Sequence, residues 1–256
     1  LSDAQATADL LLCLRQKMFQ FPKGLLERLL DLADGLLYES YLVIEEVYHK
    51  QSMLVPYDLV EVQGLFLKKE SKPLEPRKLS KDFTRNIALL GLDDRPNQTR
   101  FAESVEELLT ENKASFIQAQ TGLGKTYGYL LPALTLEREE GILLSVPTKI
   151  LQNQIMQEEG RRLKETFHLT VHSLKGPQNY LKLDAFHRLL DRPETNRLFT
   201  RFKMQLLIWL TETDTGDLDE IGQLYRYQHF LPELVHDGKL SQRTLFATED
   251  FWKRGQ

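Results

Sequence analysis

The sequence predicts an α/β fold with a parallel sheet, preceded by a mostly helical segment. After residue 95, short apolar runs alternate with stretches of helical apolar spacing, a pattern typical of parallel β-α-β units. The sequence AQTGLGKT joins one apolar run to the next helical stretch, as in phosphate-binding loops. Residues 1–52 differ, because their apolar side chains, mostly leucines, recur at helical intervals.

The size and composition fit a folded protein with one large or two smaller domains. The chain has 256 residues, of which 41% are hydrophobic, enough for a substantial core. We expect a cytoplasmic protein without a membrane segment, because no apolar run approaches about 18 residues and the start lacks a basic signal-peptide region. The chain starts with Leu1 and stops at TEDFWKRGQ without a closing element, so we expect an excised piece of a longer protein.

Charge and cysteine content limit the possible sites. The chain carries 33 basic and 37 acidic side chains, so its formal charge of −4 gives no global attraction for nucleic acid and a local basic surface would be needed. The single cysteine, Cys13, cannot form an internal disulfide or a multi-cysteine metal site. Cys13 lies in an apolar helical pattern and is expected to be a small core residue.

The first part of the chain is expected to form helices and then strands. One helix is predicted within residues 1–19, and a second begins at Pro22 and continues to residue 50. Residues 57–70 partly alternate and are rich in β formers, which predicts a strand or two. Residues 70–95 are polar and contain Pro73 and Pro76, so we expect a linker or hinge there.

The second part of the chain carries the predicted parallel sheet. The expected helices are residues 101–109, 125–136 and 149–163, and the expected short strands are residues 115–119, 142–146 and 169–173. Strands that alternate with helices at this spacing imply a sheet covered on both faces.

The segment AQTGLGKT predicts a nucleotide-binding site. Gly122 and Gly124 allow the backbone to curl so that successive N–H groups point inwards, and the next helix adds its positive N-terminal end. Lys125 is expected to contact the β and γ phosphates of ATP, and the Thr126 hydroxyl to hold Mg²⁺. The predicted loop contacts are Gln120, Thr121, Gly122, Leu123, Gly124, Lys125 and Thr126. The alternative is a glycine turn followed by an ordinary lysine.

Two neighbouring motifs narrow the class of protein. Arg95 and Gln98 stand just before the helix that leads to the loop, and a glutamine amide can donate and accept hydrogen bonds together, as an adenine edge requires. Thr148, Lys149 and Gln152 follow the next predicted strand, beside the crevice where open α/β sheets bind ligands. The alternative for this second group is an ordinary helix start with Thr148 as the N-cap.

Four segments, in order along the chain, resemble superfamily 2 DNA helicases of the DinG and XPD type: RPNQ, AQTGLGKT, SVPTKILQNQI and LKGPQNYL. From about residue 90 onwards, the resemblance implies a RecA-like motor domain that uses ATP and Mg²⁺ and binds single-stranded DNA. It implies that Arg95 and Gln98 contact adenine and that Lys125 and Thr126 are catalytic. The DNA-facing residues that it implies are Thr148, Lys149, Gln152, Lys175, Asn179 and Tyr180.

The chain departs from that family where iron–sulfur ligation begins. Lys182 stands where the first cluster cysteine would follow Leu181, and no cysteine occurs after Cys13. Because these clusters need thiolate ligands, no Fe–S cluster is expected. Residues 182–256 resemble the helical insertion that carries the cluster in relatives, as in cluster-free DinG-like proteins.

Several side chains of the expected insertion have alternative interpretations. Lys182 is expected to be a solvated side chain rather than a catalytic one. Trp209, Tyr225 and Tyr227 could stack on bases, but aromatic residues at helical spacing more often belong to a core, and we prefer the core interpretation.

The start of the chain resembles the end of a second enzyme domain. SDAQATADLL is similar to the last metal-binding segment of the 3′–5′ exonuclease domain that precedes the helicase in DinG-like proteins of low-GC Gram-positive bacteria. The match implies that Asp3 is a catalytic, metal-binding carboxylate of a two-metal site whose histidine partner would precede Leu1. The alternative is that Asp3 only caps the first helix, and we expect it to be inert as a nuclease residue here.

Together these patterns predict a piece of an ATP-dependent DNA helicase fused to an exonuclease. The predicted parts are residues 1–52 (helical end of the exonuclease and connecting helices), 53–94 (strand-containing linker), 95–181 (start of the motor domain) and 182–256 (helical insertion). The parent would couple ATP hydrolysis to translocation on, or processing of, single-stranded DNA in repair or replication.

The chain by itself is expected to bind nucleotide without turnover. The Asp-Glu-x-His motif that hydrolysis needs is absent from its sequence. The alternatives are a non-catalytic single-stranded DNA-binding module and an unrelated P-loop kinase. Neither a membrane nor an obligate protein partner is expected.

Overall fold

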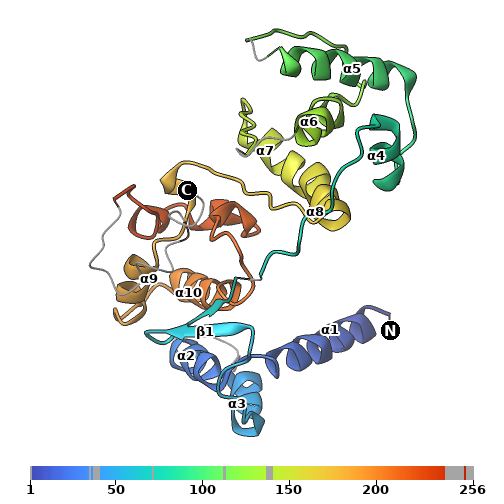
Figure 1. Cartoon of the computed structure of the whole chain (residues 1–256). Coiled ribbons are helices and arrows are strands. Elements are labelled where there is room, and N and C mark those ends of the chain that lie inside the picture. Colours follow the sequence, from blue (N-terminus) through green and yellow to red (C-terminus); the bar gives the residue numbers. More distant parts are fainter. Residues whose placement is uncertain are drawn as a thin grey trace. The chain divides into compact units, whose positions relative to one another are not determined.

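The chain folds as two compact units. The computed structural model describes residues 2–34, 36, 41–70, 72–111, 114–136, 141–239 and 251. Unit 1 combines Leu1–Ser71 with Leu174–Gln256, and unit 2 is Lys72–Ser173. In Figure 1, α2, α3, β1, α9 and α10 belong to unit 1, and α4 to α8 belong to unit 2. The four-part division expected for the parent protein stays a prediction.

Unit 1 is built from helices and one β-hairpin. Its elements are α1 (Ser2–Met18), α2 (Lys23–Ala33), α3 (Tyr41–Lys50), β1 (Leu59–Val62), β2 (Leu65–Lys68), α9 (Leu183–Leu190) and α10 (Arg197–Trp209). Three short 3₁₀ turns follow α10, at Leu218–Glu220, Leu224–Tyr227 and Leu231–Glu233. The predicted helices at the start of the chain are confirmed, although the second one is described as the two helices α2 and α3.

The hairpin follows from local sequence. Gln63 and Gly64, between the strands, both have positive φ, of 52° and 77°. Two consecutive residues of this conformation make the turn that matches the twist of antiparallel strands. The register pairs Leu59 with Lys68 and Val62 with Leu65. The prediction of a strand or two in this segment is therefore confirmed.

The core of unit 1 combines residues from an early and a late segment of the chain. The buried face of α2, which includes Leu25, Leu26 and Leu29, belongs to the same hydrophobic cluster as Phe202 and Leu206 of α10. Long-range backbone bonding adds to this packing, because the Lys68 amide of β2 donates to the Leu210 carbonyl at 3.2 Å. The segment expected as linker and the segment expected as insertion thus share one core.

Aromatic stacking confirms the core interpretation for part of the insertion. The Tyr227 ring stacks on Phe202 with 4.1 Å between ring centroids, and Phe230 stacks on Phe199 at 4.3 Å. Trp209 is also buried, but Tyr225 is exposed. The expectation of a core role is therefore right for Trp209 and Tyr227 and wrong for Tyr225.

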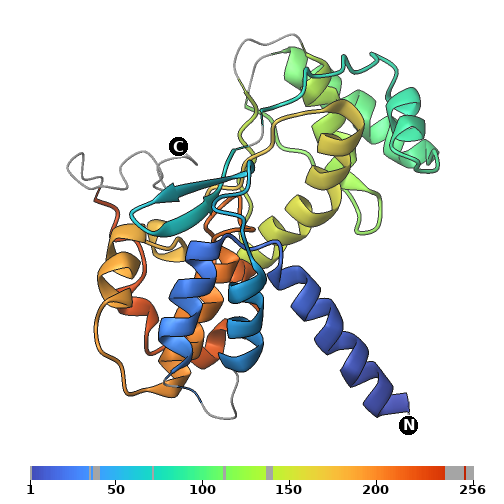
Figure 2. The same ribbon diagram turned by 90° about the horizontal axis from the view of Figure 1, so that it is seen from below.

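The leucine-rich helix α1 is mostly exposed. Leu10, Leu11, Leu12 and Leu14 all have more than half of their surface open, and Cys13 is exposed as well. Figure 2 shows α1, in dark blue, running away from α2 and α3. The expectation that Cys13 lies in a core is wrong for this structure, because helical spacing of apolar residues does not itself supply a packing partner.

Unit 2 is helical throughout its described secondary structure. Its elements are α4 (Phe83–Leu89), α5 (Pro96–Thr110), α6 (Lys125–Thr135), α7 (Lys149–Ile155), a π-helical turn (Met156–Gly160) and α8 (Arg161–Phe167). Ile87 of α4, Leu131 of α6 and Phe167 of α8 meet in one buried cluster. Helix α4 lies in the segment expected to be a linker; the Asp82 carboxylate caps it by accepting from the Thr84 amide at 2.9 Å.

The parallel sheet expected in unit 2 is not formed by the described residues. No strand forms at the three predicted positions, residues 115–119, 142–146 and 169–173. The sheet in the described part of the chain consists of β1 and β2 alone. Phe116 and Leu143 are almost fully exposed. Strand character needs a neighbouring strand to pair the backbone N–H and C=O groups, so apolar β-forming sequence is insufficient without a ladder partner. The strand predictions are therefore wrong for this chain.

Truncating the buried face of α2 is expected to destabilise α10 as well. Leu29, 1% exposed, would leave a cavity when replaced by alanine, so Leu29→Ala should lower the free energy of unfolding of unit 1 by about 2–5 kcal/mol. Urea unfolding followed by Trp209 fluorescence, in a Trp252→Phe background, checks this. Leu12→Ala on exposed α1 is the control and should change stability by at most about 0.5 kcal/mol. An unshifted Trp209 transition in Leu29→Ala would show that α2 and α10 do not share a core.

Candidate nucleotide-binding site

The loop before α6 has the backbone shape of an anion cradle. Gly122 and Gly124 both have left-handed φ values, of 79° and 82°, which residues with a side chain rarely adopt. Gly124 is the N-cap of α6, and Lys125 is the first residue of this 11-residue helix. The first-turn N–H groups of a helix lack partners within the helix and carry partial positive charge, so the loop and helix start together suit a phosphate.

The Lys125 ammonium lies at this loop. Its Nζ donates to the carbonyl oxygens of Ala119 at 3.2 Å and Gln120 at 3.0 Å. Both acceptors are neutral, and a charged phosphate oxygen makes a stronger hydrogen bond with an ammonium group than a carbonyl does. Lys125 is therefore placed where an anion would replace its two carbonyl partners. The donor set fits the triphosphate expected from the sequence.

The structure also brings the upstream motif to the loop. The Gln98 side chain is buried and its Nε2 donates to the Gly124 carbonyl at 2.7 Å. Arg95 is exposed and its guanidinium makes a longer contact, 3.5 Å, to the Gly122 carbonyl. Gln98 therefore supports the loop backbone directly. The adenine contacts of Arg95 and Gln98 stay a prediction.

An acidic side chain that the sequence patterns did not indicate lies on the π-helical turn after α7. Glu159 is partly buried there, and its Oε2 atom has no hydrogen-bond partner among the described residues. Burial raises the pKa of its carboxyl above the usual value, and the influence of Thr126 opposes this only in part. No local motif marks Glu159, so only folding reveals its environment.

The motif at the start of α7 forms a helix cap. Thr148 is the N-cap, and its Oγ1 accepts from the Leu151 amide at 3.2 Å. Lys149 is exposed on the first turn and Gln152 is partly exposed on the second. The alternative interpretation of Thr148 as a cap is confirmed. A cap hydroxyl can coexist with a DNA-facing role, which stays a prediction for these three residues.

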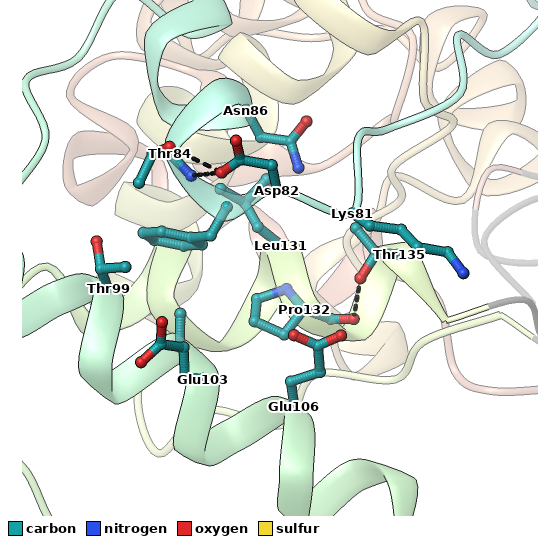
Figure 3. A pocket seen from close by; sticks show the side chains of 12 residues that line it. Lys81, Asp82, Thr84, Asn86, Thr99, Glu103, Glu106, Leu131, Pro132 and Thr135 are labelled. Atoms are coloured by element: carbon teal, nitrogen blue, oxygen red, sulfur yellow. Dashed lines mark hydrogen bonds between the residues drawn. The ribbon is translucent and has the colours of Figure 1, made fainter.

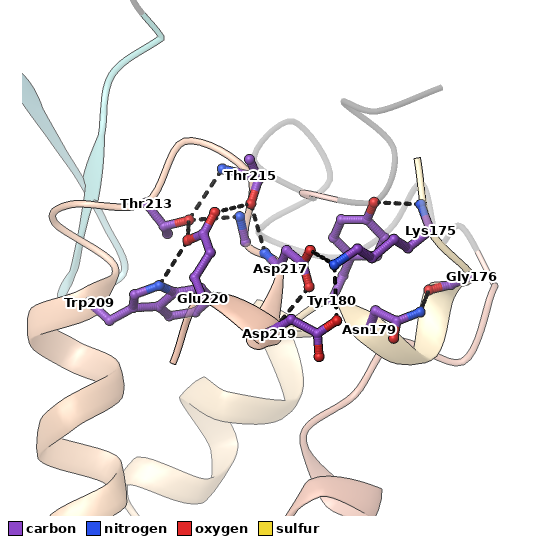
Figure 4. Close-up of polar contacts among 11 residues, drawn as sticks. Lys175, Gly176, Asn179, Tyr180, Trp209, Thr213, Thr215, Asp217, Asp219 and Glu220 are labelled. Atoms are coloured by element: carbon purple, nitrogen blue, oxygen red, sulfur yellow. Dashed lines mark hydrogen bonds and ion pairs between the residues drawn. The ribbon is translucent and has the colours of Figure 1, made fainter. Parts of the chain in front are cut away.

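The other predicted DNA-facing residues lie in unit 1 and have internal partners. Lys175 Nζ pairs with Asp217 at 2.5 Å and Asp219 at 2.9 Å, and only 2% of its side chain is exposed (Figure 4). Burial lowers the pKa of Lys175, but the hydrogen bonds that its ammonium donates to the Asp217 and Asp219 carboxylates outweigh this and raise the pKa above its usual value. Lys175 therefore acts as a structural cation in this structure.

Tyr180 and Asn179 complete the same internal arrangement. The Tyr180 hydroxyl accepts from the Lys175 amide at 2.9 Å, and Asn179 Nδ2 donates to the Gly176 carbonyl at 2.8 Å. Both residues are buried. The DNA-facing roles of Lys175, Asn179 and Tyr180 stay predictions, although in this structure the three side chains are enclosed and have internal partners.

A second polar network fixes the segment after α10. Glu220 accepts hydrogen bonds from the Trp209 indole at 3.0 Å, from Thr213 at 2.7 Å and from Thr215 at 2.5 Å (Figure 4). The polar edge of Trp209 is therefore occupied within the protein.

Lys182, expected to be solvated, is partly exposed. Its ammonium pairs with the Asp237 carboxylate at 3.0 Å, which lowers the pKa of Asp237 to about 2.

Asp3 stands apart from other possible metal ligands. It lies in the exposed first turn of α1, and its backbone carbonyl accepts from the Thr7 hydroxyl at 2.8 Å. Across the described residues, no group of three or more His, Cys, Asp or Glu side chains is arranged to hold a metal ion. The metal-binding and catalytic roles of Asp3 stay predictions for a longer protein.

A separate cleft lies between α4, α5 and α6, with a volume of about 250 Å³ (Figure 3). Its lining includes Asp82 and Phe83 at the start of α4, Glu103 of α5, and Leu131 and Pro132 of α6. None of the predicted nucleotide contacts lines it. The cradle is thus an open feature of the loop rather than part of this cleft.

Comparisons with known proteins agree with the motif order. Residues 95–211 match the DEAD/DEAH box helicase family. The chain is 30% identical over 231 residues to a 3′-5′ exonuclease DinG of Staphylococcus saprophyticus, covering 86% of this chain and 25% of that protein. It is 29% identical over 232 residues to the 3′-5′ exonuclease DinG of Staphylococcus aureus strain bovine RF122, covering 86% of this chain and 26% of the relative. No solved structure matches the chain.

These matches show which proteins the chain resembles and how much of their length it spans. The chain is similar to DinG proteins over most of its length, and residues 95–211 resemble part of a DEAD/DEAH box helicase domain, a match that implies a RecA-like P-loop fold. The chain spans about a quarter of the length of the curated relatives it matches. None of the helices in the described part of the chain has both the length and the apolar character to cross a bilayer.

Adding a methyl group at Gly124 is expected to damage the loop more than adding one at Gly122. A Cβ at Gly124 would lie 2.3 Å from Gln98 Nε2, whereas one at Gly122 meets open space. Both substitutions carry a left-handed backbone cost of about 1–2 kcal/mol. Thermal unfolding should therefore show a larger loss for Gly124→Ala, and this excess should vanish when both substitutions are compared in a Gln98→Ala background. Equal losses in wild-type background would contradict the Gln98 contact.

Removing the Lys175 ammonium is expected to be strongly destabilising. Lys175→Met leaves Asp217 and Asp219 without their shared cation, and breaking a buried pair typically costs about 3–5 kcal/mol. Lys182→Met is the matched control, because its pair with Asp237 is partly exposed and should contribute at most about 1 kcal/mol. Chemical unfolding measures both. Similar losses in the two variants would mean that Lys175 is not the structural cation described above.

Proposed function

Because the chain is similar to DinG proteins and residues 95–211 resemble part of a DEAD/DEAH box helicase domain, we propose that it is a piece of an ATP-dependent, cytoplasmic DNA helicase fused to a 3′–5′ exonuclease. The observation that carries this proposal is the Lys125 loop, where two left-handed glycines, a helix start and a lysine ammonium meet. The printed names of the relatives support the exonuclease part, since each is called a 3′-5′ exonuclease.

The residues of the loop would hold ATP and Mg²⁺ in distinct ways. The N–H groups at the start of α6 would bind phosphate oxygens, and Lys125 would exchange its two carbonyl partners for the β and γ phosphates. The Thr126 hydroxyl would be the protein ligand of Mg²⁺. When bound, Mg²⁺ neutralises phosphate charge. Arg95 and Gln98, at the start of α5, contact carbonyl groups of the loop and would read the adenine.

The chain would bind nucleotide without hydrolysing it. Its sequence contains no Asp-Glu-x-His motif to activate a water molecule. The apolar segments on either side of α6, residues 114–119 and 141–146, form neither helix nor strand and carry exposed side chains such as Phe116 and Leu143. In the parent protein, pairing of these segments with further strands would complete the motor domain, and Asp3 would serve the exonuclease.

The single-stranded DNA contact would lie at the start of α7. Thr148 is tied to the helix as its cap, and Lys149 presents an exposed cation on the first turn. Helix starts and basic side chains are the usual partners of the DNA backbone. A non-catalytic DNA-binding module remains the alternative, because such a module could use this surface without nucleotide. An unrelated kinase is disfavoured by the helicase match over residues 95–211.

Nucleotide binding should depend on Lys125 and respond to DNA through Lys149. A charged hydrogen bond contributes about 1.5–3 kcal/mol, so we expect Lys125→Ala to weaken the binding of a fluorescent ATP analogue about 10- to 100-fold. Lys149→Ala should bind the analogue with wild-type affinity, but single-stranded DNA should no longer change that affinity. Titration with and without Mg²⁺ and DNA measures these effects. Equal binding of nucleotide by wild type and Lys125→Ala would contradict the proposed site.

A further inference from the structure

Helix α5 docks against the start of α6 at two glycines. Gln98 and Phe101 follow one another by one turn on α5. Gly124 is the N-cap of α6, and Gly128 follows it by one turn. A Cβ atom at Gly124 would lie 2.3 Å from Gln98 Nε2, and one at Gly128 would lie 2.5 Å from Phe101 Cδ1. The two side chains of α5 therefore fill the space beside these glycines, so the positions of α5 and of the loop depend on each other.

The Gln98 amide fixes the direction of one peptide group of the loop. Gln98 is 5% exposed, and its Nε2 donates to the Gly124 carbonyl at 2.7 Å. In a trans peptide the carbonyl and the N–H of the next residue point in opposite directions. A Gly124 carbonyl that is held towards α5 therefore directs the Lys125 N–H away from α5. This N–H belongs to the first turn of α6, whose donors have no partner within the helix.

Arg95 acts in the same sense on the other left-handed glycine. Its guanidinium lies 3.5 Å from the Gly122 carbonyl, a longer and weaker contact than that of Gln98. Glycine has no Cβ atom to restrict its backbone, so the peptide groups beside Gly122 and Gly124 reorient easily unless something holds them. Donors from α5 restrict this freedom. A loop that already has the bound shape loses less conformational entropy when a phosphate binds.

We propose that Gln98 is a positioning residue for the phosphate-binding loop, which raises the affinity of the loop for phosphate groups whether or not a base is attached. The inference rests on the proposed function, because it assigns a role within the same site. It differs from the adenine contact expected of Gln98, because it acts through the Gly124 backbone and needs no base. The amide carries two hydrogens and two acceptor lone pairs, so one bond to the loop leaves the rest of its capacity available.

The test compares a ligand that has no base with one that has a base. Binding of inorganic pyrophosphate and of ADP, at one Mg²⁺ concentration, is measured by calorimetry for wild type, Gln98→Ala, Gln98→Met and the control Asn97→Ala. Methionine keeps the length of the side chain and removes the donor, and Asn97 is an exposed amide next to Gln98 in the chain. Loss of one neutral hydrogen bond should weaken both ligands by the same factor, about 3- to 10-fold, in the Gln98 variants. Asn97→Ala should bind both ligands as wild type does.

A second comparison separates positioning from general support of the fold. Thermal unfolding without ligand identifies the variants that are folded at the titration temperature, and Gln98→Met retains the packing if Gln98→Ala does not. If Gln98 acts through the loop that carries Lys125, the double variant Gln98→Met, Lys125→Ala should bind pyrophosphate more tightly than the product of the two single losses predicts. Losses that multiply fully would show that the two residues act independently, which contradicts the inference.

Three further results would overturn the inference. If Gln98→Met binds pyrophosphate as wild type does and loses affinity only for ADP, Gln98 contacts the base and does not position the loop. If Asn97→Ala loses as much affinity as Gln98→Met, the effect belongs to the start of α5 in general. If wild type binds ADP but not pyrophosphate, the loop has no affinity that is independent of the base, although the nucleotide site stands. Failure of wild type to bind either ligand would instead refute the proposed nucleotide site, and this role with it.

Discussion

The packing of α2 against α10 is the contact on which unit 1 depends. Leucines of α2 and phenylalanines of α10 are buried in one cluster, although about 170 residues separate the two helices in the chain. The hairpin β1–β2 closes this core and donates a backbone hydrogen bond to Leu210. Because burial of apolar surface is the main favourable term in folding, this shared core makes a single unit of two distant segments.

Polar contacts then determine how the segments of unit 1 connect. Lys175, just before the expected insertion, pairs with Asp217 and Asp219 after α10. Glu220 accepts three side-chain hydrogen bonds in the same segment. An isolated β-bridge between Tyr180 and Asp217 adds a backbone connection. Residues that resemble DNA contacts in sequence are thus used for internal support. Ion pairs and aromatic packing hold this segment in the structure.

In unit 2 the decisive constraint is the left-handed backbone before α6. Gly122 and Gly124 make the loop possible, and Gln98 lies so close to Gly124 that a side chain there would collide with it. This arrangement places Lys125 and Thr126 at the helix start, where phosphate binding is physically favourable.

Local sequence was sufficient for most of the helices, the strands of the hairpin, the cap at Thr148 and the left-handed glycines before α6, because each depends on backbone preferences and neighbours within a few residues. It was insufficient for the buried state of Lys175, the exposure of α1 and the partial burial of Glu159, because these depend on partners far along the chain. The strand predictions for residues 115–119 and 142–146 failed for the same reason: β-forming sequence needs a paired strand. The sequence by itself therefore marked the residues of the loop before α6 as candidate nucleotide contacts, and tertiary packing decided which of the other candidate side chains are enclosed, because burial depends on partners far along the chain.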